Sequence, residues 1–201
     1  MHVAIALYPK FTALDAVGPY TVLAFAPDTT VTFVAATPGP VTDDQGTLTI
    51  TATAGLSDVP RPDVLLVPGG PGTFEALNDQ ALLDWIRTAH EHTTWTTSVC
   101  SGSLILGAAG ILDGVKATSH WAILDHLATY GAEPTKERVV AQGKIVTAAG
   151  VSAGIDMALT LLATAAGEEK ARAVQLAIEY DPQPPFPMDP AYADAALKLL
   201  S

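Results

Sequence analysis

The residues with the clearest chemical potential surround Cys100, the one cysteine of the chain. Trp95–Val99 has the composition of a buried strand, and residues 101–109 have a helical pattern. Cys100 is therefore expected in a tight turn from strand to helix, where small neighbours such as Gly102 let the chain reverse. A helix beginning at Ser101 points unpaired N–H groups and the positive end of its dipole at the sulfur, which favours the reactive thiolate.

A lone cysteine has a competing interpretation, because free cysteines are more often inert hydrophobic residues of the core. The predicted position of Cys100 decides between the two, since binding sites of open α/β sheets lie at the carboxyl ends of strands. We expect Cys100 to be a catalytic nucleophile whose pKa lies well below the value of a free cysteine, roughly 8.5. A single cysteine also excludes an intrachain disulfide.

A glycine-rich turn, Pro68-Gly69-Gly70-Pro71-Gly72, follows the apolar run Val64–Val67. Glycines let the main chain approach closely, so the N–H groups of Gly70 and Ser101 could together form an oxyanion site. The alternative is a plain tight turn. No Gly-Lys-Ser/Thr follows, so the segment is not a phosphate-binding loop.

Asp15 lies at the start of a predicted helix over residues 15–26. Its carboxylate either complements the positive end of that helix or carries protons beside the thiol, and sequence alone leaves both interpretations open. The roles of His120 and His126 also stay open. No histidine pair has metal-ligand spacing joined to other ligands, so we predict neither a metal nor a cofactor.

The elements that position these residues alternate between strands and helices. Predicted strands cover residues 3–7, 31–36, 64–67 and 95–99, with an exposed antiparallel strand at 48–51 and a hairpin at 139–148; predicted helices cover 15–26, 80–90, 101–109, 121–130, 152–166, 168–180 and 191–200. This alternation predicts an α/β fold with a mostly parallel sheet covered on both faces. We expect one domain over residues 1–201.

Charge and patterning exclude several classes of partner. The net charge of −11 repels nucleic acid and anionic membrane surfaces. The N-terminus lacks the basic region of a signal peptide, and the longest apolar stretches, about ten residues, cannot cross a bilayer. We expect a cytoplasmic protein.

Three motifs resemble the ThiJ/PfpI superfamily over nearly the whole chain: Val67-Pro68-Gly69-Gly70, Ser98-Val99-Cys100-Ser101-Gly102 and Ala148-Ala149-Gly150. The resemblance implies a flavodoxin-like three-layer sandwich, related to class I glutamine amidotransferases, with a cysteine at the strand-to-helix turn. It also implies a homodimer, and the proline-rich segment over residues 180–186 suits packing against a partner.

Within this superfamily the chain is more similar to isocyanide hydratases. The similarity lies in residues 14–19, 107–112, 117–121 and 178–186. It implies a lyase (hydro-lyase) that adds water to a small isocyanide, R–N≡C, and releases an N-substituted formamide. Cys100 would form a thioimidate, Asp15 would handle protons, Gly70 and Ser101 would donate main-chain N–H groups, and the Ser101 hydroxyl matches a hydroxylated family position.

Differences from neighbouring families argue against two alternative functions, those of a PfpI-type peptidase and a glutamine amidotransferase. PfpI-type peptidases carry Cys-His at the turn, whereas this chain has Ser101, and no histidine follows His126 to complete an amidotransferase triad. One alternative is a cysteine enzyme acting on reactive carbonyls, of the glyoxalase or deglycase kind. Others are a redox sensor and the regulatory half of an AraC-type transcription factor, although the chain has no basic tail or room for a helix-turn-helix.

Overall fold

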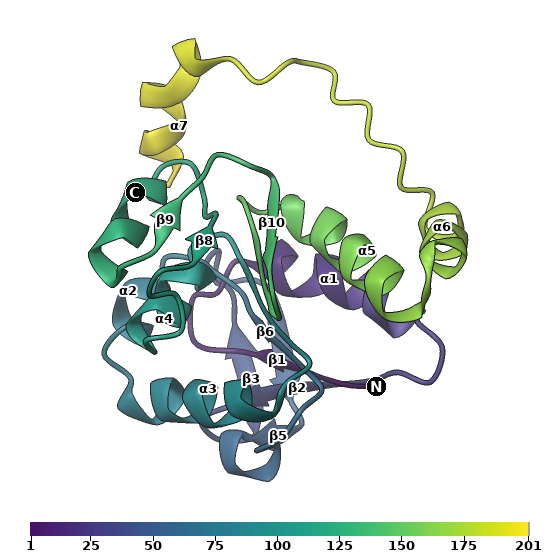
Figure 1. The fold of residues 1–201 in the computed structure, drawn as a ribbon. Helices are drawn as coiled ribbons and strands as arrows, with labels where there is room; N and C mark the ends of the chain where they lie inside the picture. The colour runs from purple at the N-terminus through teal and green to yellow at the C-terminus, as the bar shows by residue number, and fades with distance from the viewer. Residues whose placement is uncertain (201) are drawn as a thin grey trace.

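The computed structural model describes residues 1–200, which form an α/β sandwich around a seven-stranded sheet (Figure 1). Neighbouring strands of this sheet run parallel except for the hairpin β10–β11. The spatial order is β10 (Val139–Gln142), β11 (Ile145–Ala148), β7 (Trp95–Val99), β6 (Val64–Val67), β1 (His2–Ala6), β2 (Thr30–Ala35) and β5 (Ala54–Gly55). The predicted fold class is confirmed.

Helices cover both faces of the sheet. The α-helices of residues 1–200 are α1 (Ala13–Ala24), α2 (Thr73–Ala76), α3 (Gln80–His92), α4 (Gly102–Ala108), α5 (Ala153–Ala166), α6 (Glu168–Ala177) and α7 (Ala193–Leu199), of which α7 lies away from the sheet (Figure 1). The helices α1 and α5 pack against each other on one face, and α3 and α4 pack on the opposite face (Figure 1). The central strands are therefore shielded on both sides, which explains why β6 is continuously apolar and β1 is apolar after His2.

The structure also contains smaller elements outside the central sheet and the α-helices. Two short ladders are β3 (Gly39–Thr42) with β4 (Thr49–Ala52), which is antiparallel as predicted, and β8 (Lys116–Ala117) with β9 (Glu133–Pro134). Three 3₁₀ helices are η1 (Leu56–Asp58), η2 (Leu124–Tyr130) and η3 (Pro190–Tyr192).

The predicted helix over residues 121–130 is wrong in type and in its start. The structure has the 3₁₀ helix η2 there, beginning at Leu124. Leu124 and Leu127 are the buried residues of this element, and a spacing of three matches the 3₁₀ period. The element ends at Gly131, whose φ of 76° is left-handed.

Two adjacent strands carry the segments singled out in the sequence. The bounds of β6 and β7 are as predicted, and the strands pair in parallel with Val67 opposite Ser98. Every residue of β6 is buried. Because both strands end at the same edge of the sheet, the glycine turn after Val67 and the cysteine after Val99 become neighbours.

The C-terminal arm, defined as residues 179–200, leaves the body after α6. It runs around the outside of the molecule before α7 returns to the side of η2 and β9 (Figure 1). Phe186, Met188 and Tyr192 on the arm are 80%, 90% and 70% exposed. Among residues 1–200 no helix combines the length and apolar character needed to cross a membrane.

Candidate active site

Cys100 occupies a strained turn between β7 and α4. Its φ of 57° lies in the left-handed region, which non-glycine residues rarely adopt. Two hydrogen bonds fix the turn, because the Cys100 N–H donates to the carbonyls of Ala148 (3.1 Å) and Ala149 (3.0 Å). Gly102 permits the reversal, since a Cβ there would lie 2.2 Å from the Val67 carbonyl oxygen.

Asp15 is a fully buried carboxyl on the first turn of α1, with 0% exposure. Its Oδ2 accepts a hydrogen bond of 2.9 Å from the Gly69 N–H, while Oδ1 has no hydrogen-bond partner among the described residues. Burial raises the pKa of Asp15 to about 7, and hydrogen bonds from Gly69 and from the Cys100 thiol oppose that rise. The carboxyl therefore faces the thiol, as the proton-carrier interpretation requires.

The environment of the Cys100 sulfur contradicts the expectation that the pKa of Cys100 lies below that of a free cysteine. Burial, together with the smaller effect of the negative charge of Asp15, raises the pKa of the thiol to about 12. Hydrogen bonds from the N–H groups of Ser101 and Val151, and from the Ser101 hydroxyl, act in the opposite direction without overcoming burial. Because the two groups interact strongly, Asp15 and Cys100 titrate as one pair. Between about pH 7 and about pH 12 this pair holds one proton.

Ser101 and Gly70 lie next to each other and are hydrogen-bonded to each other. The Gly70 N–H donates to Ser101 Oγ at 2.9 Å, so this amide is engaged within the protein and does not point freely at a substrate. Ser101 Oγ also lies 2.7 Å from Thr73 Oγ1, which in turn lies 3.1 Å from the Tyr8 hydroxyl. Tyr8 donates to the Pro68 carbonyl at 2.7 Å. This buried network fixes the glycine turn against the cysteine turn.

A cavity of about 550 Å³ lies next to the turn that contains Cys100, although Cys100 itself is not part of its lining. Its lining includes Ala149 and Val151, which hydrogen-bond to Cys100, and Ser119, whose Oγ donates to the Cys100 carbonyl at 2.9 Å. Trp121 adds an aromatic side chain that is 45% exposed. Residues in contact with Cys100 therefore form part of the cavity wall.

The two histidines whose roles the sequence left open differ in position. His120 lines this cavity and lies against Gly150, where an added Cβ would be 2.4 Å from the ring. Burial lowers the pKa of His120, so its ring is neutral at neutral pH. The Ala122 N–H donates to its Nδ1 at 3.3 Å, which leaves the proton of the neutral ring on Nε2. His126 is exposed on η2.

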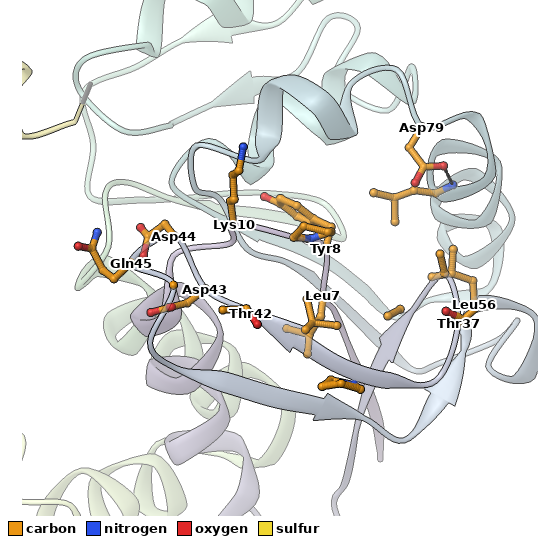
Figure 2. A pocket seen from close by; sticks show the side chains of 17 residues that line it. Leu7, Tyr8, Lys10, Thr37, Thr42, Asp43, Asp44, Gln45, Leu56 and Asp79 are labelled. Carbon is orange, nitrogen blue, oxygen red and sulfur yellow. Dashed lines mark hydrogen bonds between the residues drawn. The ribbon is translucent and has the colours of Figure 1, made fainter.

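A second cavity, of about 650 Å³, lies beside the β3–β4 ladder (Figure 2). Figure 2 shows Asp44 and Gln45 on one side of it and Leu56 on the other. Neither Cys100 nor Asp15 lines either cavity, but the larger one also lacks Ser119, Ala149 and Val151, the residues that hydrogen-bond to Cys100. Asp44 in its lining stabilises the local structure, because Asp44 Oδ2 accepts a hydrogen bond of 2.7 Å from the Thr12 hydroxyl. We therefore place the candidate active site at the smaller cavity.

The sequence missed two main-chain donors. Gly69, and not Gly70, holds the Asp15 carboxylate, although the motif containing both was noted. Val151 presents its N–H to the sulfur from a left-handed conformation with φ of 36°. A β-branched residue is among the least expected at positive φ, so nothing in the sequence pointed to it.

Comparisons with known proteins identify relatives of this chain. The profile of the DJ-1/PfpI family matches residues 1–164. The isonitrile hydratase of Pseudomonas putida is 46% identical over 92% of this chain and 81% of its own length. The crystal structure of a ThiJ/PfpI family protein from Pseudomonas syringae superposes with a TM-score of 0.94 at 41% identity, covering 99% of this chain and 85% of that one.

A transcriptional regulator is similar in sequence to part of this chain. The HTH-type regulator CdhR of Pseudomonas aeruginosa is 32% identical over 66% of this chain, which corresponds to 40% of the regulator. Taken with the family profile, these similarities identify the chain as a member of the DJ-1/PfpI family.

Proposed function

We propose that this protein is an isocyanide hydratase that converts R–N≡C and water into an N-substituted formamide, R–NH–CHO. The observation that carries the proposal is the buried pair of Asp15 and Cys100, a thiol facing a carboxyl of raised pKa. The resemblance to the isonitrile hydratase of Pseudomonas putida supports the same reaction.

The pair supplies both groups that the first step needs. Transfer of the thiol proton to Asp15 gives a thiolate and a carboxylic acid without a change in net charge. The thiolate attacks the terminal carbon of the isocyanide, and the Asp15 proton is delivered to that carbon, which gives the thioimidate Cys100–S–CH=N–R. The N–H groups of Ser101 and Val151 stabilise the thiolate before attack.

The second step returns the enzyme to its starting state. The carboxylate of Asp15 accepts a proton from water as the water oxygen attacks the thioimidate carbon. The C–S bond then breaks, the nitrogen is protonated, and the formamide leaves while the pair again holds one proton. Ser101 Oγ, held by the Gly70 N–H and Thr73, keeps the turn in place, so we assign Gly70 a positioning role.

The substituent R is proposed to occupy the cavity of about 550 Å³ beside Cys100. This space suits a small molecule. Trp121 and Leu124 supply apolar surface on its wall, and the neutral His120 supplies one donor. We therefore propose small alkyl and aryl isocyanides as substrates.

We also propose that the protein is a cytoplasmic homodimer. The large exposed apolar side chains of the C-terminal arm, Phe186, Met188 and Tyr192, support a second copy packing against the arm. The nucleophilic thiol supports a reducing compartment, where a free cysteine persists.

Incubation of the purified protein with cyclohexyl isocyanide and with phenyl isocyanide tests the reaction, with the corresponding formamide followed by liquid chromatography. We expect formamide in proportion to enzyme and none with C100A. Methylglyoxal provides the decisive comparison. Turnover of methylglyoxal without formamide from either isocyanide assigns the protein to the reactive-carbonyl enzymes and overturns the proposal.

A further inference from the structure

The loop of residues 149–152 forms one wall of the Cys100 site. The Ala149 carbonyl accepts the Cys100 N–H at 3.0 Å, and the Val151 N–H is directed at the sulfur. Val151 has a φ of 36°, a left-handed conformation that is strained for a β-branched residue. A loop strained in this way keeps its conformation only where surrounding contacts fix it.

Arg138 contacts both ends of this loop. At the first end its main-chain carbonyl accepts the Ala149 N–H at 2.9 Å. At the other end its guanidinium Nη2 donates to Ser152 Oγ at 3.2 Å. Gly150 and Val151 are therefore bracketed by hydrogen bonds to one residue.

Asp156, on the first turn of α5, holds the guanidinium in place. Its Oδ2 accepts from Arg138 Nε at 2.9 Å and from Nη2 at 2.7 Å. The Tyr180 hydroxyl donates to the same carboxylate oxygen at 2.9 Å. Asp156 does not line the cavity beside Cys100, so it can influence the site only through Arg138 and α5.

We propose that Arg138 is a positioning residue for Cys100, which holds the loop of residues 149–152 so that the Val151 N–H keeps facing the sulfur. Without the guanidinium contact, the strained loop relaxes and the thiolate loses one of its main-chain donors. The other titratable groups near the sulfur are Asp15, which faces it directly, and Tyr8. This inference rests on the role of Cys100 as nucleophile in the proposed function.

The test measures the rate of Cys100 alkylation by iodoacetamide against pH in the full-length protein. Loss of one N–H donor to a charged group corresponds to about a tenfold change. We expect R138Q and D156N to alkylate about tenfold more slowly near neutral pH, with profiles displaced upward by about one pH unit. R138K retains one of the hydrogen bonds that the guanidinium makes. Its alkylation rate is expected to lie between those of R138Q and wild type.

R172Q is the matched control, because Arg172 makes a comparable arginine–carboxylate pair with Glu168 on α6. Its profile is expected to coincide with wild type. If R138Q does not fold, D156N is the variant that tests the proposal. Profiles of R138Q or D156N that superimpose on wild type overturn the proposal, as does an equal displacement in R172Q.

Turnover adds an independent readout. D156N is expected to lower kcat with little change in KM, because Asp156 does not line the cavity. Absence of formamide from wild type, combined with displaced alkylation profiles in the variants, refutes the proposed reaction and leaves the positioning role of Arg138 standing.

Discussion

The carboxyl of Asp15 faces the thiol of Cys100 within the protein interior, and the two groups influence each other's ionisation. The charge of Asp15 raises the pKa of the thiol, while a hydrogen bond from the thiol lowers that of Asp15. Burial is the largest influence on both and disfavours two negative charges. In the proposed mechanism the reactive form is the pair with one proton, and the predictions below depend on that proton.

The first prediction concerns the pH dependence of kcat/KM. The pair takes up its second proton as pH falls through the pKa of Asp15, about 7, and loses its last proton only near the pKa of the thiol, about 12. We expect kcat/KM to rise with pH across about 7 and then to stay level in the alkaline range. An initial-rate profile that falls between about pH 6 and about pH 8 would contradict this assignment.

The second prediction concerns Asp15→Asn, which removes the proton carrier and keeps the shape of the side chain. Turnover should fall by at least about 100-fold, the lower end of the usual contribution of acid–base catalysis. Asp79→Asn is the matched control, because Asp79 caps α3 through the Leu82 N–H and asparagine caps equally well. A D15N enzyme with wild-type turnover would show that Asp15 serves only its helix.

The stability of the same variant has a defined pH dependence. The pKa of Asp15 is raised on folding from 3.8 to about 7, so the native state binds more protons than the unfolded state between those values. The free energy of unfolding of wild type, relative to D15N, should fall by about 1.4 kcal/mol per pH unit from about pH 4 to about pH 7. Urea unfolding at several pH values measures this difference, and a flat difference contradicts the burial of a protonated carboxyl.

The third prediction concerns Gly69→Ala. An added Cβ would lie 2.5 Å from both Ser101 N and Ser101 Oγ, so the glycine turn and the cysteine turn must shift relative to each other. We expect loss of turnover and destabilisation by about 1–3 kcal/mol. Gly143→Ala is the control, because Gly143 has a φ of 60° with open space around it, so the substitution costs about 1 kcal/mol and spares turnover.

The fourth prediction concerns assembly. Light scattering at micromolar concentration should give the mass of a dimer. The double substitution of Phe186 and Met188 by serine should shift the protein toward monomer, because these side chains are exposed on the arm. Phe25→Ser, at a residue 59% exposed outside the arm, should leave the mass unchanged. A stable wild-type monomer refutes the homodimer.

The strands that carry the site could be predicted because their signals are local. The strands β6 and β7 are short apolar or threonine-rich runs ended by Pro68 and Cys100, so their bounds follow from composition. The pairing of Asp15 with Cys100 was one of two open interpretations. Their proximity depends on how α1 packs against the sheet, which no local pattern specifies.

The remaining details of the site arise from contacts between residues distant in sequence. The bond between the Gly70 N–H and Ser101 Oγ joins positions 31 residues apart. The left-handed conformation of Val151 contradicts its intrinsic preference and is imposed by its surroundings. The low pKa expected for Cys100 was inferred from the helix N-terminus. That inference did not include the degree of burial, which the three-dimensional structure determines.

The central claim is that isocyanide hydration proceeds through a covalent bond to Cys100, and mass spectrometry of the protein quenched during turnover tests it most directly. The account predicts a mass increase equal to one isocyanide molecule, located on the peptide containing Cys100 and absent from the C100S and C100A variants. Both variants should stay folded and give no formamide. Formamide production by wild type without any adduct on Cys100, or by C100A, would contradict the account.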